Sequence, residues 1–126
     1  QDPRDPIAIA AIASLQRDGI SLPEDERFLQ NMLLKNPDAA HLNFALGNVY
    51  AQQEKWKSAQ QSYFNAWQQD IENADYIFNL AVSLDQLGKP EQALSLYRES
   101  LSKSNDKQVS FSREDVKKRI TELSGL

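Results

Sequence analysis

The chain reads "AHLNFALGNVYAQQEKWKSAQQSYFNAWQQDIEN" from residue 40 to 73 and "ADYIFNLAVSLDQLGKPEQALSLYRESLSKSNDK" from residue 74 to 107. Placed one above the other without a gap, the two stretches carry identical residues at seven positions: Ala40/Ala74, Phe44/Phe78, Leu46/Leu80, Gln52/Gln86, Lys55/Lys89, Ala59/Ala93 and Tyr63/Tyr97. A fixed period of this length predicts a repeat protein, in which neighbouring copies stack to bury a common core.

Each copy is predicted to form two helices, because its apolar residues recur at helical spacing in two groups. In the first copy the groups are Leu46, Val49, Tyr50 and then Ala59, Tyr63, Ala66, Trp67. Between the groups the second copy has Gly88 and Pro90, which are typical of a helix end and a helix start. The first copy has no glycine in its turn, so we expect that turn to cost more free energy.

The same register extends towards the N-terminus as a degenerate unit over residues 6–39. Its sequence predicts a helix over 7–16 that Gly19 ends, and a second helix that opens at a capping box over 21–24. That second helix is expected to stop before Pro37, because proline disfavours helical geometry in the residue before it.

The register also extends towards the C-terminus, over residues 108–126. Another capping box begins at Ser112, and Val116, Ile120 and Leu123 follow on one helix face. We expect a single helix here that closes the stack.

The residues that best define the repeat are Leu46, Gly47, Tyr50, Ala59, Tyr63 and Ala66 in one copy, and Leu80, Ala81, Leu84, Ala93 and Tyr97 in the next. This pattern resembles the tetratricopeptide repeat (TPR), although Asn43 and Ile77 stand where that family often has Trp, and Ser100 replaces a small Ala. The resemblance implies an all-α fold: a right-handed superhelix of five to seven helices in antiparallel pairs, a TPR-like α-solenoid built as one domain over residues 1–126.

Small residues are expected to let the two helices of each unit approach closely, at Gly47, Ala59, Ala66, Ala81 and Ala93. Tyr63 and Tyr97 are expected to fill the gap to the next unit. A large side chain at Ala59 or Ala93 would overpack this contact.

The charge balance does not favour nucleic acid or an anionic membrane as a partner, because 18 acidic residues outnumber 14 basic ones. Six cations lie in the last 24 residues among acidic side chains, which predicts a solvated helix end. The most apolar run, 7–15, is far shorter than the roughly 20 residues that span a bilayer, so direct membrane insertion is not expected. The absence of cysteine is compatible with a cytoplasmic or a periplasmic location.

Catalysis is not predicted, because the single His41 has no second histidine or cysteine with which to build a site. No phosphate loop, calcium loop or zinc motif is present, so neither a cofactor nor a metal is expected. The carboxylates spread along the helices, at Asp75, Asp85, Glu91 and Glu99, are interpreted as solvated helix faces.

The resemblance places the first helix of each unit on the concave side of the superhelix, where this family binds an extended or helical peptide. The predicted peptide-binding groove is lined by Phe44, Asn48, Gln52, Phe78, Asn79, Val82 and Gln86. Amide side chains offer a donor and an acceptor to a peptide backbone, and phenyl rings offer apolar area. The alternative is that the two phenylalanines belong to the core and the asparagines are merely solvated.

Chaperone-binding members of the family hold a partner's terminal carboxylate with lysines, an arginine and two asparagines. Asn48 and Asn79 match the asparagine positions and Arg113 falls at a matching offset, but Phe44 stands where the first lysine should be. A carboxylate clamp is therefore not expected.

The predicted function is non-catalytic protein–protein interaction, as a scaffold or adaptor that binds a partner peptide or helix. One alternative is a self-associating structural module such as a homodimer, favoured by the apolar residues within 7–16. The other is the TPR part of a larger bacterial secretion or pilus assembly protein.

Overall fold

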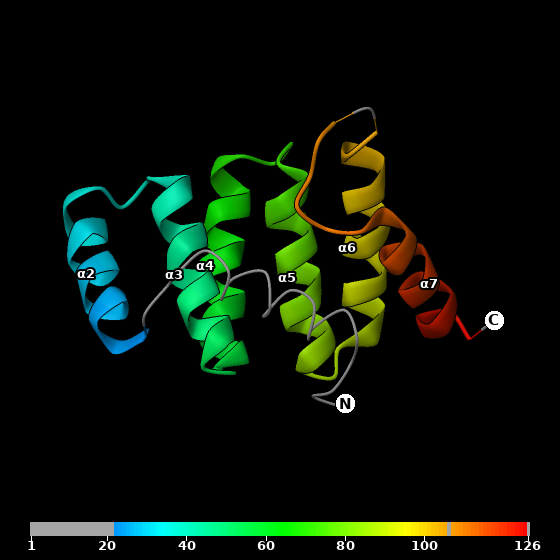
Figure 1. Ribbon diagram of the computed structural model, residues 1–126, viewed down its shortest axis with the longest axis horizontal. Helices are drawn as coiled ribbons and strands as arrows, with labels where there is room; N and C mark the ends of the chain where they lie inside the picture. Colours follow the sequence, from blue (N-terminus) through cyan, green and yellow to red (C-terminus); the bar gives the residue numbers. More distant parts are fainter. Residues whose placement is uncertain (1–21, 106, 126) are drawn as a thin grey trace.

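The computed structural model describes residues 22–105 and 107–125, and in this part of the chain it contains helices and no strand. The helices are α2 (Leu22–Lys35), α3 (Ala40–Gln52), α4 (Trp56–Gln69), α5 (Ala74–Gln86), α6 (Pro90–Lys103) and α7 (Arg113–Leu123). They lie side by side in chain order, from α2 at one end to the tilted α7 at the other (Figure 1). Each helix packs against the next one along the chain, and this confirms the all-α stack of helix pairs. None of the described helices is long and apolar enough to cross a membrane.

The helices begin and end close to where the local sequence signals predict. Helix α2 ends at Lys35, two residues before Pro37, and α6 begins at Pro90. Ser112 caps α7 by accepting a hydrogen bond from the backbone N–H of Asp115. The predicted helix over 7–16, its end at Gly19 and the first residue of the capping box over 21–24 lie outside the described residues.

The turns inside the two helix pairs share one left-handed position, and only the second pair has a glycine there. In the second pair Gly88 has a φ of 75°, a left-handed conformation that glycine adopts without steric cost. Glu54 holds the equivalent place in the first pair and has a φ of 57°. A non-glycine residue in this region brings its Cβ too close to the backbone, so the first turn is strained.

Close contact within the first pair depends on a position without a side chain. Gly47 of α3 lies under the ring of Tyr63 of α4, and a Cβ at Gly47 would stand 2.6 Å from the ring carbons Cδ1 and Cε1. Ala59 and Ala66, on the same helix as Tyr63, are fully buried. Small residues thus let α4 lie directly on the backbone of α3, as the pattern predicts.

Aromatic rings connect each helix pair to the segment that follows it. The centroid of Phe44 in α3 lies 4.7 Å from that of Tyr76 in α5. In the same way Phe78 in α5 stacks on Phe111, just before α7, with centroids 4.6 Å apart. The two equivalent phenylalanines therefore form successive contacts along the stack.

Helix α7 is attached to α5 by a buried ion pair. The guanidinium of Arg119 donates from Nε and Nη2 to the two oxygens of Asp85, over 2.8 and 2.7 Å. Only 1% of the Asp85 side chain and 16% of the Arg119 side chain are exposed. The interpretation of Asp85 as a solvated carboxylate is therefore wrong, because its partner lies 34 residues away and meets it only when α7 packs on α5.

Relief of the strained turn gives a first prediction. Glu54 is exposed, so Glu54→Gly should raise the free energy of unfolding by about 0.5–1 kcal/mol, since the left-handed strain outweighs the added freedom of the unfolded chain. Urea unfolding followed by far-UV circular dichroism measures the change. Gly88→Ala is the matched control and should lower stability. Equal or lower stability of Glu54→Gly would contradict the assignment of strain.

The contact between Gly47 and Tyr63 gives a second prediction. Gly47→Ala would ordinarily stabilise a helix by about 1 kcal/mol, but the new methyl group meets the buried ring and overpacking costs about 1–3 kcal/mol. We therefore expect a net loss of stability in urea unfolding. Ser58→Ala, at an exposed position of α4, should show no comparable loss. A stabilised Gly47→Ala variant would show that the ring moves aside at little cost.

Candidate functional site

The predicted groove residue Asn48 is held by a tyrosine from the second helix of its own pair. The hydroxyl of Tyr63 donates to Oδ1 of Asn48 over 2.7 Å, and both side chains are buried. Burial raises the pKa of the Tyr63 hydroxyl above its ordinary value, so the hydroxyl stays protonated and remains a donor. Asn48 is therefore part of the internal structure of the first pair.

The second pair has the same arrangement with a different acceptor. The hydroxyl of Tyr97 donates to Oδ2 of Asp85 over 2.9 Å. Asp85 lies one helical turn beyond Val82, which is the residue equivalent to Asn48. The acceptor thus lies one helical turn further along the first helix in the second pair. There it also accepts hydrogen bonds from the guanidinium of Arg119.

The other predicted groove residues in the second pair are largely buried. The side-chain amide of Asn79 donates to the backbone oxygen of Asp75 in its own helix over 2.9 Å. Phe78 and Val82 are buried, and Phe78 lies between the rings of Tyr97 and Phe111. These contacts favour the alternative in which the phenylalanine belongs to the core.

Phe44 lies in a similar setting in the first pair. Its ring centroid is 5.6 Å from that of Tyr63 and 4.7 Å from that of Tyr76, and the residue is half-buried. Burial raises the pKa of Tyr76, and the carboxylates of Asp70 and Asp75 raise it further. Phe44 thus packs within the protein and keeps part of its surface exposed.

Gln52 and Gln86 are the predicted groove residues that keep unused hydrogen-bonding capacity. They occupy the same position, at the ends of α3 and α5, and both are half-buried. Within the described part of the chain, Oε1 of Gln52 and Nε2 of Gln86 are buried and have no hydrogen-bond partner. One acceptor and one donor are therefore unpaired at the equivalent ends of α3 and α5, the first helices of the two pairs.

Arg113, which matches a clamp position in the sequence, binds within the protein. Its Nη1 donates to the backbone oxygen of Leu101 over 2.8 Å and also contacts the hydroxyl of Ser104. Its Nη2 donates to Asn105 over 3.1 Å. The guanidinium thus binds the C-terminal end of α6, where helix carbonyl groups need donors.

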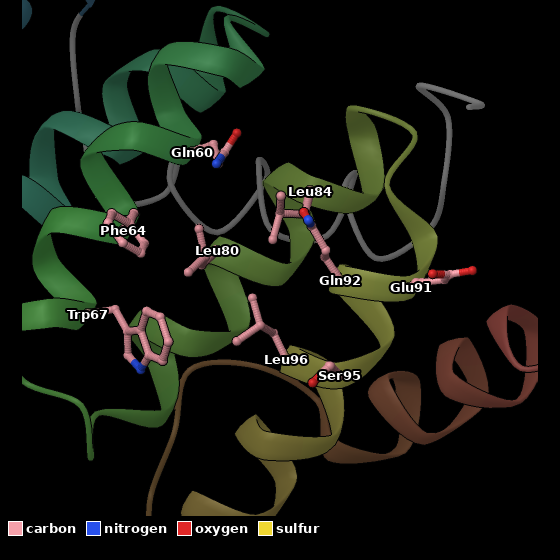
Figure 2. Close-up of a pocket in the computed structure, with 9 residues that line it drawn as sticks. All are labelled: Gln60, Phe64, Trp67, Leu80, Leu84, Glu91, Gln92, Ser95 and Leu96. Carbon is pink, nitrogen blue, oxygen red and sulfur yellow. The ribbon is translucent and has the colours of Figure 1, made fainter.

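A pocket on another part of the surface was not predicted from the sequence. Figure 2 shows Phe64 and Trp67 of α4 facing residues of α6, with Leu80 and Leu84 of α5 between them. The pocket has a volume of about 460 Å³, and its other lining residues are Gln60, Glu91, Gln92, Ser95 and Leu96. The sequence feature that could have predicted this pocket is a second apolar stripe on α4, formed by Phe64 and Trp67, beside the stripe that packs on α3.

An exposed ion pair ties the turn between α4 and α5 to the end of α6. Nζ of Lys103 lies 2.6 Å from Oε2 of Glu72. The hydrogen bond from Lys103 and its charge lower the pKa of Glu72, and the same contact raises the pKa of Lys103. Because both groups face solvent, this pair contributes little to stability.

The bond between Tyr63 and Asn48 can be tested by a double-mutant cycle. Tyr63→Phe and Asn48→Leu each leave one buried polar group unpaired and should each cost about 1–3 kcal/mol. The double variant removes both groups, so its loss should be smaller than the sum by about 0.5–3 kcal/mol. Tyr50→Phe is the control, because its hydroxyl binds an exposed side chain, Gln30. Additive losses would show that the bond contributes nothing to stability.

A comparison with family models matches residues 77–109 to the tetratricopeptide repeat. A search of curated proteins found no match to the chain. The matched segment contains most of α5 and all of α6. Together, the match and the helices packed in adjacent pairs fit a TPR-like protein.

Proposed function

We propose that this protein binds a segment of a partner protein along the face formed by the first helices, α3 and α5. The tetratricopeptide repeat family supports a protein-interaction or scaffold role in general, and its fold is generally non-catalytic. To that general role we add a location and a set of contact residues.

The observation that carries the proposal is the pair of unpaired amides at Gln52 and Gln86. A buried polar atom without a partner costs about 1–3 kcal/mol, so two such atoms at equivalent positions are an unusual feature of a stable stack. Both residues are partly exposed, and rotation of either side chain would bring its unpaired atom to a bound chain that supplies one N–H and one C=O. Side-chain amides suit this task because each offers a donor and an acceptor.

The remaining groove residues support this face in different ways. Phe44 is half-buried and offers part of its ring to a partner. Asn48, Phe78, Asn79 and Val82 shape the face from within, since each is buried against neighbouring residues. Partner contact is therefore assigned first to Gln52 and Gln86, then to Phe44.

Self-association stays a second prediction. The apolar residues that favour it lie within 7–16, outside the described residues, so no contact in the structure supports it. Membership of a larger secretion or pilus assembly protein likewise stays a prediction from the sequence.

The test compares two double variants of the intact chain. The partner is first captured with the intact chain and purified. Gln52→Ala/Gln86→Ala should raise its dissociation constant at least about tenfold, the change expected when about 1.4 kcal/mol of hydrogen bonding is lost. Stability should not fall, since Oε1 of Gln52 and Nε2 of Gln86 have no hydrogen-bond partner in the free protein. Asn48→Ala is a poor probe, because it would also release Tyr63.

The matched control is Gln61→Ala/Gln68→Ala, which removes two exposed glutamines from α4. Isothermal titration calorimetry of both variants against the same partner gives the comparison. The control should bind like the unchanged protein. Unchanged affinity in Gln52→Ala/Gln86→Ala would overturn the assignment of the site.

A further inference from the structure

We propose that the pocket between α4 and α6 is a second interaction surface, which binds an amphipathic α-helix of a partner protein. The bound helix inserts large apolar side chains between α4 and α6 and places a lysine or an arginine beside Glu91. This inference goes beyond the proposed function, because the pocket lies at the second helices and uses none of the predicted groove residues.

The pocket lies on the side of α5 opposite to the predicted groove. Leu80 and Leu84 of α5 line the pocket and are one helical turn apart. Phe78 and Val82 belong to the groove, and each precedes one of these leucines by two residues, a step that turns a helical side chain by about 200°. A partner at the pocket therefore leaves the face of α3 and α5 free for another segment.

The centre of the pocket is apolar. Phe64 and Trp67 of α4 form one wall, with ring centroids 5.9 Å apart, and both residues are half-buried. Leu96 of α6 faces them, and Leu80 and Leu84 lie between the two helices (Figure 2). Aromatic side chains around an apolar centre are typical of the residues that contribute most to binding at protein interfaces.

The aromatic wall is not a requirement of the repeat. Tyr63 packs on α3 and recurs as Tyr97 in the next unit, whereas the neighbouring Phe64 is replaced there by Arg98, which is exposed. The second unit thus forms its helix pair without an aromatic residue at this position. Because removing apolar surface from water is favourable, the exposed part of the Phe64 ring favours contact with a partner.

The rim of the pocket is polar and acidic. Gln60, Gln92 and Ser95 are neutral, and Glu91 is the one charged residue among those that line the pocket. Glu91 is exposed, and none of the ion pairs found among the described residues includes it. Because the whole chain also has a net charge of -4, the rim favours a partner with a basic side chain.

The groups that the pocket offers favour a helix over an extended segment. The lining residues belong to α4, α5 and α6, so the walls present side chains and no strand edge. An extended segment would bring backbone N–H and C=O groups that need partners, whereas a helix satisfies these groups internally. A helix also places apolar and basic side chains three or four residues apart on one face, which matches the centre and the rim.

The experiment uses a library of helices, so the natural partner need not be identified first. The displayed probe is an alanine-rich helix of about 20 residues, with the positions of one face randomised. It is enriched on the full chain after counter-selection on Ser95→Trp, which places a large ring in the pocket from an exposed position. We expect the enriched helices to carry large apolar residues and a lysine or an arginine on the same face.

Isothermal titration calorimetry of a selected helix then tests the contacts. Glu91→Gln should weaken binding about two- to fivefold, the range of an exposed ion pair. Glu114→Gln is the matched control and should bind normally, because Glu114 is the second residue of α7 as Glu91 is of α6. Ser95→Trp should weaken binding at least about tenfold. Ser58→Trp, at an exposed position on another face of α4, should not.

The helical form of the partner is tested on the selected helix itself. A proline in its middle, on the side that faces solvent, should weaken binding at least about tenfold, because proline in a helix interior costs about 3 kcal/mol. Glutamine at the same position is the control and should bind normally. Binding that tolerates the proline would overturn the helical partner.

The other outcomes separate this inference from the proposed function. Gln52→Ala/Gln86→Ala should bind the selected helices normally, and a loss of binding there would place them on the first helices and overturn the inference. Equal binding to Glu91→Gln would overturn the basic contact. A selection without any helix that depends on the pocket would overturn the surface. A dimer that Ser95→Trp dissociates in analytical ultracentrifugation would identify a second copy as the occupant instead.

Discussion

Each helix pair is held together by one tyrosine that crosses from its second helix into its first. Tyr63 and Tyr97 are almost completely buried, so each must place its hydroxyl where a polar side chain can accept a hydrogen bond from it. Asn48 accepts it in one pair and Asp85 in the other. The rest of the packing follows from this constraint: the ring of Tyr63 needs the space that Gly47 leaves, and the first helix must commit a polar residue to the interior.

The choice of acceptor also decides how the stack ends. Asn48 is neutral and has its needs met within its own pair, whereas Asp85 is a carboxylate and needs a cation as well as a hydroxyl. Arg119 of α7 supplies that cation. It lies 34 residues after Asp85, which is the equivalent position in the next unit of the repeat. The buried ion pair thus marks the second unit as the one on which α7 docks, and the stacked rings of Phe78 and Phe111 reinforce the same contact.

These internal contacts limit which side chains on the face of α3 and α5 remain available to a partner. Residues that the resemblance assigns to a groove are partly used to build the fold, and among them Gln52 and Gln86 each keep one amide atom without a hydrogen-bond partner in the described part of the chain. The charged residues of α5 are engaged in the same internal contacts.

The sequence alone determined the period, the helix boundaries, the costlier turn at Glu54 and the small residues between helices, because these depend on local geometry and spacing. It also predicted a groove of seven residues, and of these Asn48, Phe78, Asn79 and Val82 are buried while Phe44, Gln52 and Gln86 are half-buried. Tertiary structure alone decided that Asn48 supports Tyr63 and that Asp85 is buried against Arg119, since both contacts join residues on different helices. It also formed the pocket beside Trp67. Spacing along the chain determines which residues lie on the same face of a helix. Only packing decides whether that face contacts water, an aromatic ring or an opposite charge.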